Sequence, residues 1–317
     1  MYSSFPGIGA LHPGDRVAVI APGSPPQDAT ALSAGLQRLE SAGLFVEVAP
    51  NVQARYGYLA GTDATRLDAL NAYLRRSDVK ALFCVRGGYG ALRLLPGLDY
   101  EAARRHPKLL VGYSDVTALH LALHHRAGWR GLSGPMVAVD WGILDPDSER
   151  LFFELATGAR PDPLLGPGGE ALEPVRPGTA EGILLGGNLS VLTRLVGTPY
   201  LPPLDGAILF LEDVGEAPYR LDGLLAHLRL AGLLDRLGGV VLGGFTECTP
   251  PPDRPSLSLE QVFDDYFGKA PYPVARGLVY GHFPVKSTVP VGVRARLTVT
   301  ATSATLSVLE PVVEASP

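Results

Sequence analysis

The sequence has few cysteines and no long apolar run. Only two cysteines, Cys84 and Cys248, occur among 317 residues, and neither has a second cysteine close to it in the sequence. This spacing argues against a metal knuckle, a redox pair and a disulfide scaffold, so both side chains are expected to be buried apolar groups. No apolar run approaches the ~18 residues that a membrane-spanning helix needs. No membrane partner is therefore expected.

The chain also lacks an excess of basic residues. It has 27 Lys and Arg against 32 Asp and Glu, for a formal net charge of -5. Because binding to a phosphate backbone requires a basic face, nucleic acid is not expected as the main partner. The first residues do not combine a basic segment with an apolar one, as a secretory leader would. The expected compartment is therefore the cytoplasm.

Strand and helix patterns alternate along the first half. Short apolar runs predict strands, and apolar residues at helical spacing predict helices. The strands are expected at 16–21, 45–48, 81–85 and 109–113, and the helices at 28–42, 63–74 and 116–125. This alternation is typical of a parallel sheet covered by helices, so residues 1–160 are expected to form an α/β domain.

The second half has a different pattern. Residues 161–178 are rich in proline and glycine and are expected to form a linker. Beyond them we expect strands at 181–185, 206–211, 239–242 and 296–299 and a helix at 221–231. Because residues 294–308 alternate like a pair of antiparallel or barrel strands, residues 179–317 are expected to form a β-rich domain.

Ser114 follows one of the predicted strands directly and precedes a predicted helix. The segment from Gly112 to Asp115 therefore resembles the corner that exposes a nucleophilic serine. The helix N-terminus would add free N–H groups and a partial positive charge, which stabilise an oxyanion. The match to G-x-S-x-G is partial, since Val116 occupies the second glycine position. Ser114 and Asp115 also suit simple helix caps, so both interpretations stay open at this point.

A glycine-rich turn, RGGYG at 86–90, follows the preceding strand. In a parallel sheet it would lie at the same edge as Ser114, because both follow carboxyl ends of strands. Its glycines allow positive φ and close approach to a ligand, so it is a candidate for a second oxyanion N–H. It matches neither a P-loop nor G-x-G-x-x-G. A plain tight turn is the alternative.

A serine nucleophile needs a general base and an acid that orients the base. Among seven histidines, His282 is the preferred base, because it lies in a loop between Gly281 and Phe283. The acid candidates lie in the segment 209–219. Glu212 is preferred over Glu216 because the end of a strand is more rigid than a loop.

Six sequence blocks together resemble the LD-carboxypeptidase family, which also includes the microcin C immunity proteins. They occur in the family's order and cover nearly the whole chain. The blocks are VAVIAPGSPP at 17–26, RGGYGALRLL at 86–95, VGYSDVTALHLAL at 111–123, GILLGGNLSVLTRLVGTP at 182–199, LFLEDVGEAPYRLDGLL at 209–225 and GHFPVKSTVPVG at 281–292.

The resemblance implies a Ser-Glu-His triad of Ser114, Glu212 and His282. It also implies an oxyanion hole formed by the N–H groups of Gly88 and Asp115. The fold it implies is an N-terminal α/β domain with the serine and a C-terminal, β-rich, barrel-like domain with the other two residues. Relatives are typically homodimers and use no metal or other cofactor.

The implied reaction releases the terminal D-alanine from a murein tetrapeptide during peptidoglycan recycling. Since a carboxypeptidase must bind a free carboxylate, Arg86 is a candidate for that contact, and a salt bridge is its alternative role. Asn188 is a candidate substrate contact or a helix cap.

Two other functions stay open. One is an immunity-type amidase that cleaves peptidyl or aminoacyl nucleotides, for which Phe263, Tyr266, Phe267 and Tyr272 would offer a stacking surface unless they form an amphipathic helix. The other is a muropeptide-binding protein without activity.

Overall fold

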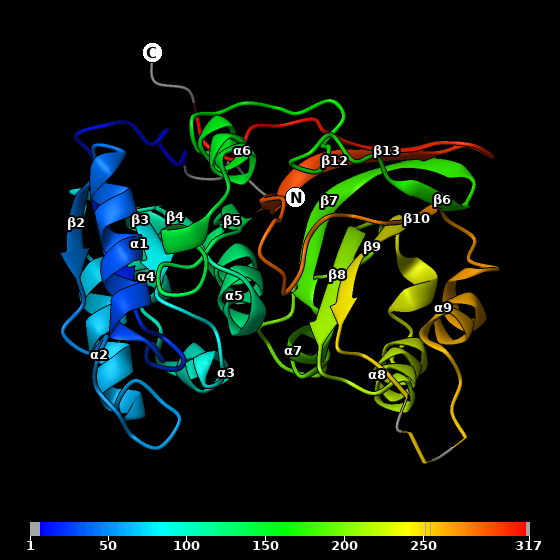
Figure 1. The fold of residues 1–317 in the computed structure, drawn as a ribbon, viewed down its shortest axis with the longest axis horizontal. Coiled ribbons are helices and arrows are strands. Elements are labelled where there is room, and N and C mark those ends of the chain that lie inside the picture. Colours follow the sequence, from blue (N-terminus) through cyan, green and yellow to red (C-terminus); the bar gives the residue numbers. More distant parts are fainter. Residues whose placement is uncertain (1–6, 251, 254, 315–317) are drawn as a thin grey trace. The chain divides into compact units, whose positions relative to one another are not determined.

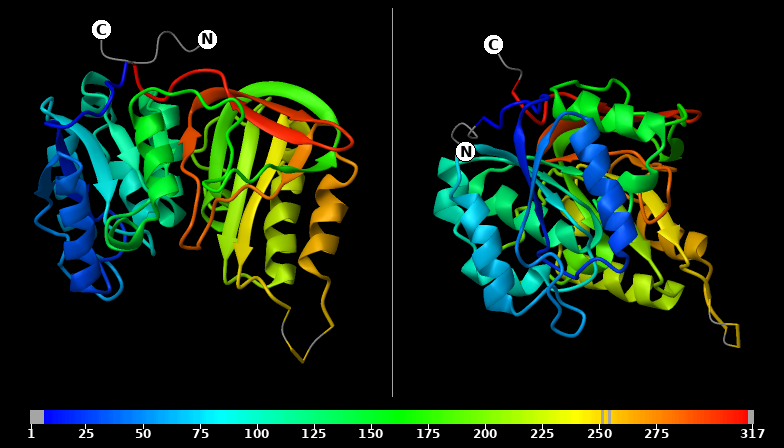
Figure 2. Two further views of the ribbon diagram at one scale, coloured as in Figure 1. Left: turned by 45° about the horizontal axis from the view of Figure 1, so that its top comes forward. Right: turned by 60° about the vertical axis from the view of Figure 1, so that its left-hand side comes forward.

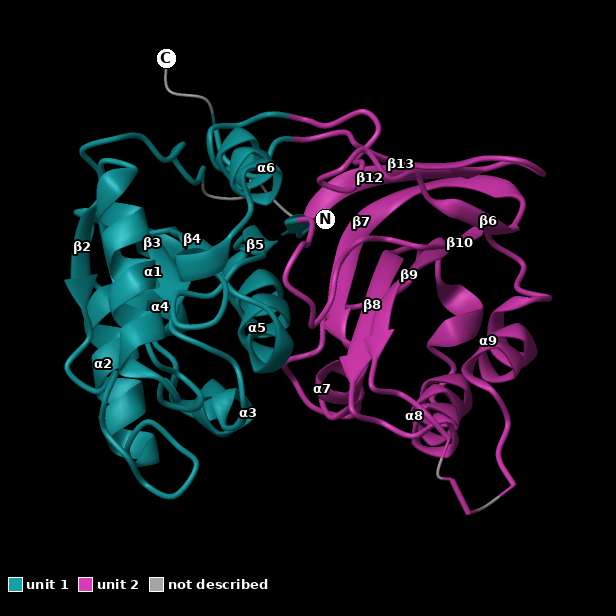
Figure 3. Ribbon diagram, in the orientation of Figure 1, with its two compact units in different colours: residues 1–159, 288–292, 311–317 teal, residues 160–287, 293–310 magenta. Residues whose placement is uncertain are grey.

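The computed structural model describes residues 7–250, 252–253 and 255–314 (Figure 1). Contacts within the chain divide it into two units (Figure 3). Unit 1 contains the described residues among 1–159, 288–292 and 311–317, and unit 2 contains those among 160–287 and 293–310. Residues 1–6, on which part of the leader prediction depends, lie outside the described residues.

Unit 1 is built on a six-stranded sheet in the order β11-β5-β4-β3-β1-β2. Five strands are parallel, and β11 pairs antiparallel with β5 at the edge. The strands are β1 (Arg16–Ile20), β2 (Phe45–Val48), β3 (Val79–Cys84), β4 (Leu109–Val111), β5 (Gly131–Ser133) and β11 (Val289–Val291). The first strand lies between the second and the third, so the strand order reverses there, and such a switch point is where α/β sheets commonly bind ligands.

Helices follow the strands of unit 1, as the alternating pattern predicts. The helices are α1 (Ala29–Ser41), α2 (Asp63–Leu74), α3 (Ala91–Leu94), α4 (Tyr100–Arg105), α5 (Thr117–Ala127) and α6 (Pro146–Ala156). Helices α2 to α5 contact one another, whereas α1 packs against the 3₁₀ segment Trp141–Ile143. Caps fix the helix starts, since Asp28 and Thr62 accept backbone hydrogen bonds at the N-termini of α1 and α2.

Unit 2 is built on a seven-stranded mixed sheet in the order β13-β12-β7-β8-β9-β10-β6. Strands β7 to β10 are parallel, and the flanking strands are antiparallel to their neighbours. The strands are β6 (Glu173–Arg176), β7 (Gly178–Asn188), β8 (Ile208–Val214), β9 (Gly239–Thr246), β10 (Val274–Arg276), β12 (Val293–Val299) and β13 (Ala304–Val308).

This second sheet curls until its edges meet. Leu172, just before β6, forms an isolated bridge with Ala304 of β13 at the opposite edge. The predicted barrel-like form is therefore confirmed. The helices of unit 2 are α7 (Leu189–Thr193), α8 (Pro218–Leu230) and α9 (Leu259–Phe267). Figure 2 shows α8 and α9 side by side along the strands.

The sequence-based boundaries differ from the structure in specific places. Residues 161–178, expected to be a linker, belong to unit 2 and contain β6. Residues 288–292, expected in the second domain, add β11 to the sheet of unit 1. The sequence could not reveal that 288–292 belong to unit 1, because a strand of three residues carries no periodic signal.

The longest strand of unit 2 was predicted too short. β7 runs from Gly178 to Asn188 and so continues through Gly186 and Gly187, whereas the strand was expected at 181–185. In the structure a side chain on Gly186 would collide with the carbonyl oxygen of Phe210, so a close approach of β7 to β8 requires glycine there. Among the described residues, no helix is long and apolar enough to cross a membrane.

Candidate active site

Ser114 lies where β4 gives way to a 3₁₀ turn, Ser114–Val116, that leads into α5. It is the only residue from Lys108 to His124 that is not buried. Its φ is 63°, and only one other described non-glycine residue has a positive φ. Such a left-handed backbone costs about 1–2 kcal/mol for a residue with a side chain. The corner leaves Ser114 partly exposed while the neighbouring residues pack into the core, as a nucleophile requires.

Capping of α5 does not explain Ser114 and Asp115. The first positions of the 3₁₀ turn and of α5 have no side-chain cap hydrogen bond. Asp115 Oδ2 instead accepts a hydrogen bond from the Ala91 N–H at 2.9 Å, which caps α3 after Gly90. The Asp115 side chain therefore ties the glycine-rich turn to the serine corner.

The glycine-rich turn lies directly against Ser114. A Cβ built on Gly87 would lie 2.8 Å from Ser114 Cβ and 3.2 Å from the Asp115 backbone nitrogen. Gly88 has a φ of 83°, and a side chain there would collide with Ser24 Oγ. The two proposed oxyanion residues, Gly88 and Asp115, therefore belong to two segments that contact each other beside the serine.

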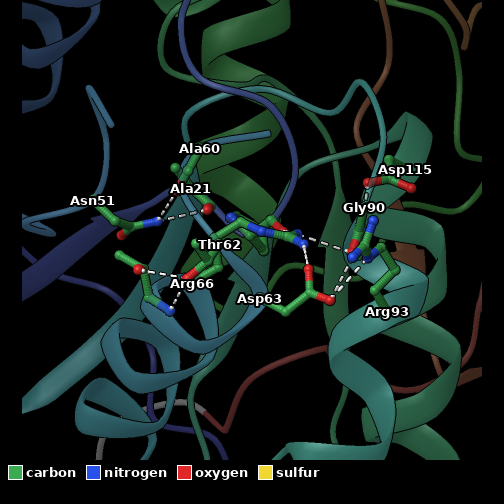
Figure 4. A network of polar contacts seen from close by, with 12 residues as sticks. Ala21, Asn51, Ala60, Thr62, Asp63, Arg66, Gly90, Arg93 and Asp115 are labelled. Atoms are coloured by element: carbon green, nitrogen blue, oxygen red, sulfur yellow. Dashed lines mark hydrogen bonds and ion pairs between the residues drawn. The ribbon is translucent and has the colours of Figure 1, made fainter. Parts of the chain in front are cut away.

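The Arg66 side chain contacts both this turn and the loop after β1 (Figure 4). Its side chain is fully buried, and Nη1 donates to the carbonyl oxygens of Pro22 and, at 2.9 Å, of Gly90. Its Nη2 lies 2.5 Å from Asp63 Oδ1, and Arg93 binds the same carboxylate. Although desolvation opposes them, Arg93 and Arg66 lower the pKa of Asp63. Arg66 thus fixes the loops after β1 and β3 relative to each other.

Two of the three histidines on α5, His120 and His124, have structural partners. His120 Nε2 lies 2.9 Å from the Gly112 carbonyl oxygen, and His124 Nδ1 lies 3.0 Å from the Trp129 carbonyl oxygen. Burial lowers the pKa of His120 to about 4, although the contact with Gly112 acts in the opposite direction. His120 is therefore neutral near pH 7 and braces the backbone just before Ser114.

Unit 2 brings His282 and Glu212 together. Glu212, near the end of β8, is completely buried, and its Oε2 lies 2.7 Å from His282 Nδ1. The His282 side chain is 20% exposed. A carboxylate on Nδ1 leaves Nε2 as the nitrogen that can accept a proton. Glu216, the other acid considered, contacts Arg220 instead, at 3.4 Å.

Asn188 supports the buried carboxylate. Its Nδ2 donates to Glu212 Oε1 at 3.2 Å and to Asp213 Oδ1 at 2.9 Å, while its Oδ1 caps α7 through the Val191 N–H. Asp213 Oδ2 in turn accepts two hydrogen bonds from Ser190, from its N–H at 2.9 Å and its hydroxyl at 2.7 Å. The cap predicted for Asn188 is present, together with an orienting contact to Glu212.

Arg86 lies at the base of the glycine turn and is partly exposed. It lines a pocket of about 250 Å³ in unit 1 together with Ser24 and Arg55. No ion pair of its side chain occurs among the described residues, so the alternative salt-bridge role has no partner there.

The sequence analysis missed several residues of this arrangement. Ser24 lay within a quoted block, but its Oγ accepts a hydrogen bond from the Tyr89 N–H, 65 positions away. Arg66, Ser190 and Asp213 were also not assigned their present contacts. A basic residue within an apolar helical pattern was the available signal for Arg66, because a buried Arg needs partners.

Both cysteines are free and buried, as predicted. Burial raises the pKa of both thiols. Within the described part of the chain, no group of three or more His, Cys, Asp and Glu side chains is arranged to hold a metal ion.

Comparisons with known proteins agree with this architecture. Residues 17–134 match the family described as the LD-carboxypeptidase N-terminal domain, and residues 181–297 match the LD-carboxypeptidase C-terminal domain. A probable murein peptide carboxypeptidase of Bacillus subtilis is 40% identical over 293 residues, 91% of this chain and 90% of that protein.

Structures and more distant relatives extend the likeness. The crystal structure of muramoyltetrapeptide carboxypeptidase from Oxalobacter formigenes has a TM-score of 0.82 and 32% identity, covering 92% of this chain and 98% of that one. The predicted pairing of an α/β domain with a β-rich one is confirmed by this match. The microcin C7 self-immunity protein MccF of Escherichia coli is 28% identical over 267 residues, 75% of this chain and 76% of that protein.

Proposed function

We propose, from the premise that this chain belongs to the LD-carboxypeptidase family, that it is a serine carboxypeptidase of murein tetrapeptides. It releases the terminal D-alanine by cutting the bond that follows the L-centre of the diamino acid. The observation that carries the proposal is the partly exposed Ser114, with its positive φ, among buried neighbours.

The proposed triad is Ser114, His282 and Glu212. Ser114 Oγ attacks the scissile carbonyl while His282 Nε2 takes its proton. Glu212 holds the other ring nitrogen at 2.7 Å, which fixes the tautomer and stabilises the imidazolium. The backbone N–H groups of Gly88 and Asp115 stabilise the oxyanion.

The second half of the reaction uses the same groups. The tetrahedral intermediate collapses, and protonated His282 gives its proton to the leaving amine of D-alanine. Water then loses a proton to His282 and attacks the acyl-enzyme, which releases the tripeptide and restores Ser114. This sequence of steps requires neither a metal ion nor another cofactor. By the same family resemblance, we place the protein in the cytoplasm as a homodimer that serves peptidoglycan recycling.

The amidase alternative depended on an aromatic stacking surface. In unit 2 these aromatics lie in or beside α9, and most have other partners. Phe267 and Tyr272 are buried, Phe263 meets Phe245 edge to face with ring centroids 4.7 Å apart, and Tyr266 donates to Asp222. Three of the four aromatics lie in α9 and Tyr272 follows it, so the helical alternative holds for those three, and the carboxypeptidase is the better-supported function.

The test is release of D-alanine from a purified murein tetrapeptide. We expect release by the wild type and by the matched control Ser33→Ala, an exposed serine on α1. Ser114→Ala should release at least about 10⁴-fold less. A fluorophosphonate should form an adduct on Ser114 that the variant cannot form.

Each other result has a definite meaning. Equal release by both variants would exclude Ser114 as the nucleophile. If the wild type cleaves a peptidyl nucleotide but not the tetrapeptide, the amidase is correct. Tight tetrapeptide binding without turnover or adduct would identify a binding protein.

A further inference from the structure

The pocket beside the glycine turn occupies the switch point of the sheet in unit 1. Its lining includes Ser24 from the loop after β1, and Arg86, Gly88 and Tyr89 from the loop after β3. These two strands are neighbours, and the strand order reverses between them. Gly88 lines the pocket, and its neighbour Gly87 lies against Ser114, so the pocket adjoins the turn that contacts the proposed nucleophile. A group bound there would be very close to the scissile bond.

The pocket has a positive lining. Arg55 and Arg86 both line it, and its described lining residues include no Asp or Glu. Within the described chain, Arg86 has no hydrogen bond or ion pair, and Arg55 donates only to the Pro26 carbonyl oxygen, at 3.1 Å.

The other arginines of unit 1 make the contrast clear. Seven of these eleven pair with a carboxylate, namely Arg16, Arg38, Arg66, Arg75, Arg76, Arg93 and Arg150. Of the rest, Arg104 and Arg130 donate to carbonyl oxygens, and Arg126 lies over the Tyr100 ring. Two guanidinium groups left without an acid at one pocket mark a place for an anionic ligand.

Ser24 adds a neutral donor to these charges. It is 5% exposed, and its Oγ accepts the Tyr89 N–H at 3.3 Å. Among the described residues its own O–H has no acceptor, so it is available to a ligand oxygen. Two guanidinium groups and a hydroxyl form a donor set that suits a carboxylate.

Two tyrosines also line the pocket. The rings of Tyr58 and Tyr89 meet edge to face, with centroids 5.9 Å apart, and both side chains line the pocket. Each tyrosine is 63% exposed, although large apolar groups are usually buried. The two rings therefore form part of the wall of the pocket that Arg55 and Arg86 also line.

We propose that this pocket binds the terminal carboxylate of the leaving D-amino acid through Arg55 and Arg86, and that Tyr58 and Tyr89 restrict cleavage to the last residue. The inference rests on the proposed carboxypeptidase function. In such a substrate the carboxylate carbon is only two bonds from the scissile nitrogen. The carboxylate site must therefore adjoin the oxyanion site, and Gly88 belongs to both. Arg55 and the two tyrosines become specificity-determining residues.

The experiment compares two substrates, the murein tetrapeptide with a free terminal carboxylate and the same peptide as its terminal carboxamide. We expect wild-type kcat/KM to be about 10²-fold higher for the acid. Arg55→Met and Arg86→Met should remove most of that preference, chiefly through KM, and leave the carboxamide rate almost unchanged. Arg55→Lys should restore part of it. Arg105→Met, at an exposed position at the end of α4, is the matched control and should behave as the wild type.

The proposed role of Tyr58 and Tyr89 is tested with a different substrate. A pentapeptide that carries one additional D-alanine should be a poor substrate of the wild type. Tyr58→Ala combined with Tyr89→Ala should raise its cleavage. If the double variant excludes the pentapeptide as strictly as the wild type does, the restriction by the tyrosines is wrong.

Binding measurements separate this inference from the proposed function. Calorimetry on Ser114→Ala should show that the tetrapeptide acid binds at least tenfold more tightly than its carboxamide, and that adding Arg55→Met and Arg86→Met removes the difference. Fluorophosphonate labelling of the arginine variants that retain Ser114 should proceed normally. Absence of D-alanine release would refute the proposed function alone. Equal binding of acid and carboxamide would refute the carboxylate pocket, whether or not turnover occurs.

Discussion

The serine corner of unit 1 and the Glu212–His282 pair of unit 2 are positioned by different physical means. At the corner, the backbone conformation positions the functional groups, since Ser114 has a φ of 63° and Gly88 a φ of 83°. In unit 2, side-chain hydrogen bonds position the functional groups, because Asn188 donates to the buried carboxylates of both Glu212 and Asp213. A substitution at the serine corner should therefore lower activity by introducing steric strain. A substitution near the Glu212–His282 pair should lower activity by removing a charge or by changing the orientation of a side chain. The predictions below test this difference.

The largest effect is expected from Glu212→Gln. The amide keeps the shape but loses the charge that stabilises imidazolium, and it can present an N–H to His282 Nδ1, which favours the wrong tautomer. We expect kcat to fall by about 10³–10⁴. Steady-state release of D-alanine measures it. Glu216→Gln is the matched control, since Glu216 contacts Arg220 and should change kcat less than about twofold. Similar losses in both variants would contradict the assignment of Glu212 as the acid.

A smaller loss is expected from Gly88→Ala. The new methyl group would meet Ser24 Oγ, and the positive φ would add strain, so the Gly88 N–H should shift away from the oxyanion position. Loss of one such donor lowers kcat by about 10²–10³.

Gly14→Ala is the matched control for backbone strain. Gly14 also has a positive φ, 94°, but nothing lies within 4 Å of a Cβ built there. It should lose about 1 kcal/mol of stability and keep kcat. Kinetics and urea unfolding of both variants distinguish these effects. An unchanged kcat in Gly88→Ala would argue against its N–H as an oxyanion donor.

Acid pH should lower the free energy of unfolding, because His120 in unit 1 is protonated more readily in the unfolded chain. Burial opposes the charged ring and lowers its pKa in the folded protein to about 4, from the ordinary value of 6.5. Between these two values the unfolded state binds the additional proton, so stability is full above about pH 6.5 and falls toward pH 4. The loss reaches about 3 kcal/mol at most.

Urea unfolding from pH 7.5 to 4 measures this dependence. His120→Gln, which can still donate to the Gly112 carbonyl, should flatten the profile between pH 6.5 and 4. His227→Gln, at an exposed position on α8, should leave it unchanged. An identical acid slope in the wild type and in His120→Gln would show that His120 does not cause it.

The smallest effect is a gain in stability. Ser114→Gly should be more stable than Ser114→Ala by about 1 kcal/mol, because only glycine adopts this backbone without strain. Because both variants lack the serine hydroxyl, the difference between their midpoints of thermal unfolding measures the cost of the positive φ. Equal midpoints would mean that the corner stores no strain.

The sequence alone determined the local elements and the chemistry of the candidate site. Strands such as 45–48 and helices such as 63–74 were predicted to the residue, because apolar periodicity and caps such as Thr62 are local signals. Ser114, Glu212 and His282 followed from strand ends and from the six blocks that resemble the family.

Only the tertiary structure decided how distant segments come together. The addition of 288–292 to the sheet of unit 1, the contact of Gly87 with Ser114, and the pairing of His282 with Glu212 rather than with Glu216 all join residues far apart in the chain. The same is true of the two arginines without acidic partners at one pocket. Such contacts depend on which surfaces pack in three dimensions, and a local pattern of residues carries no information about its distant partner.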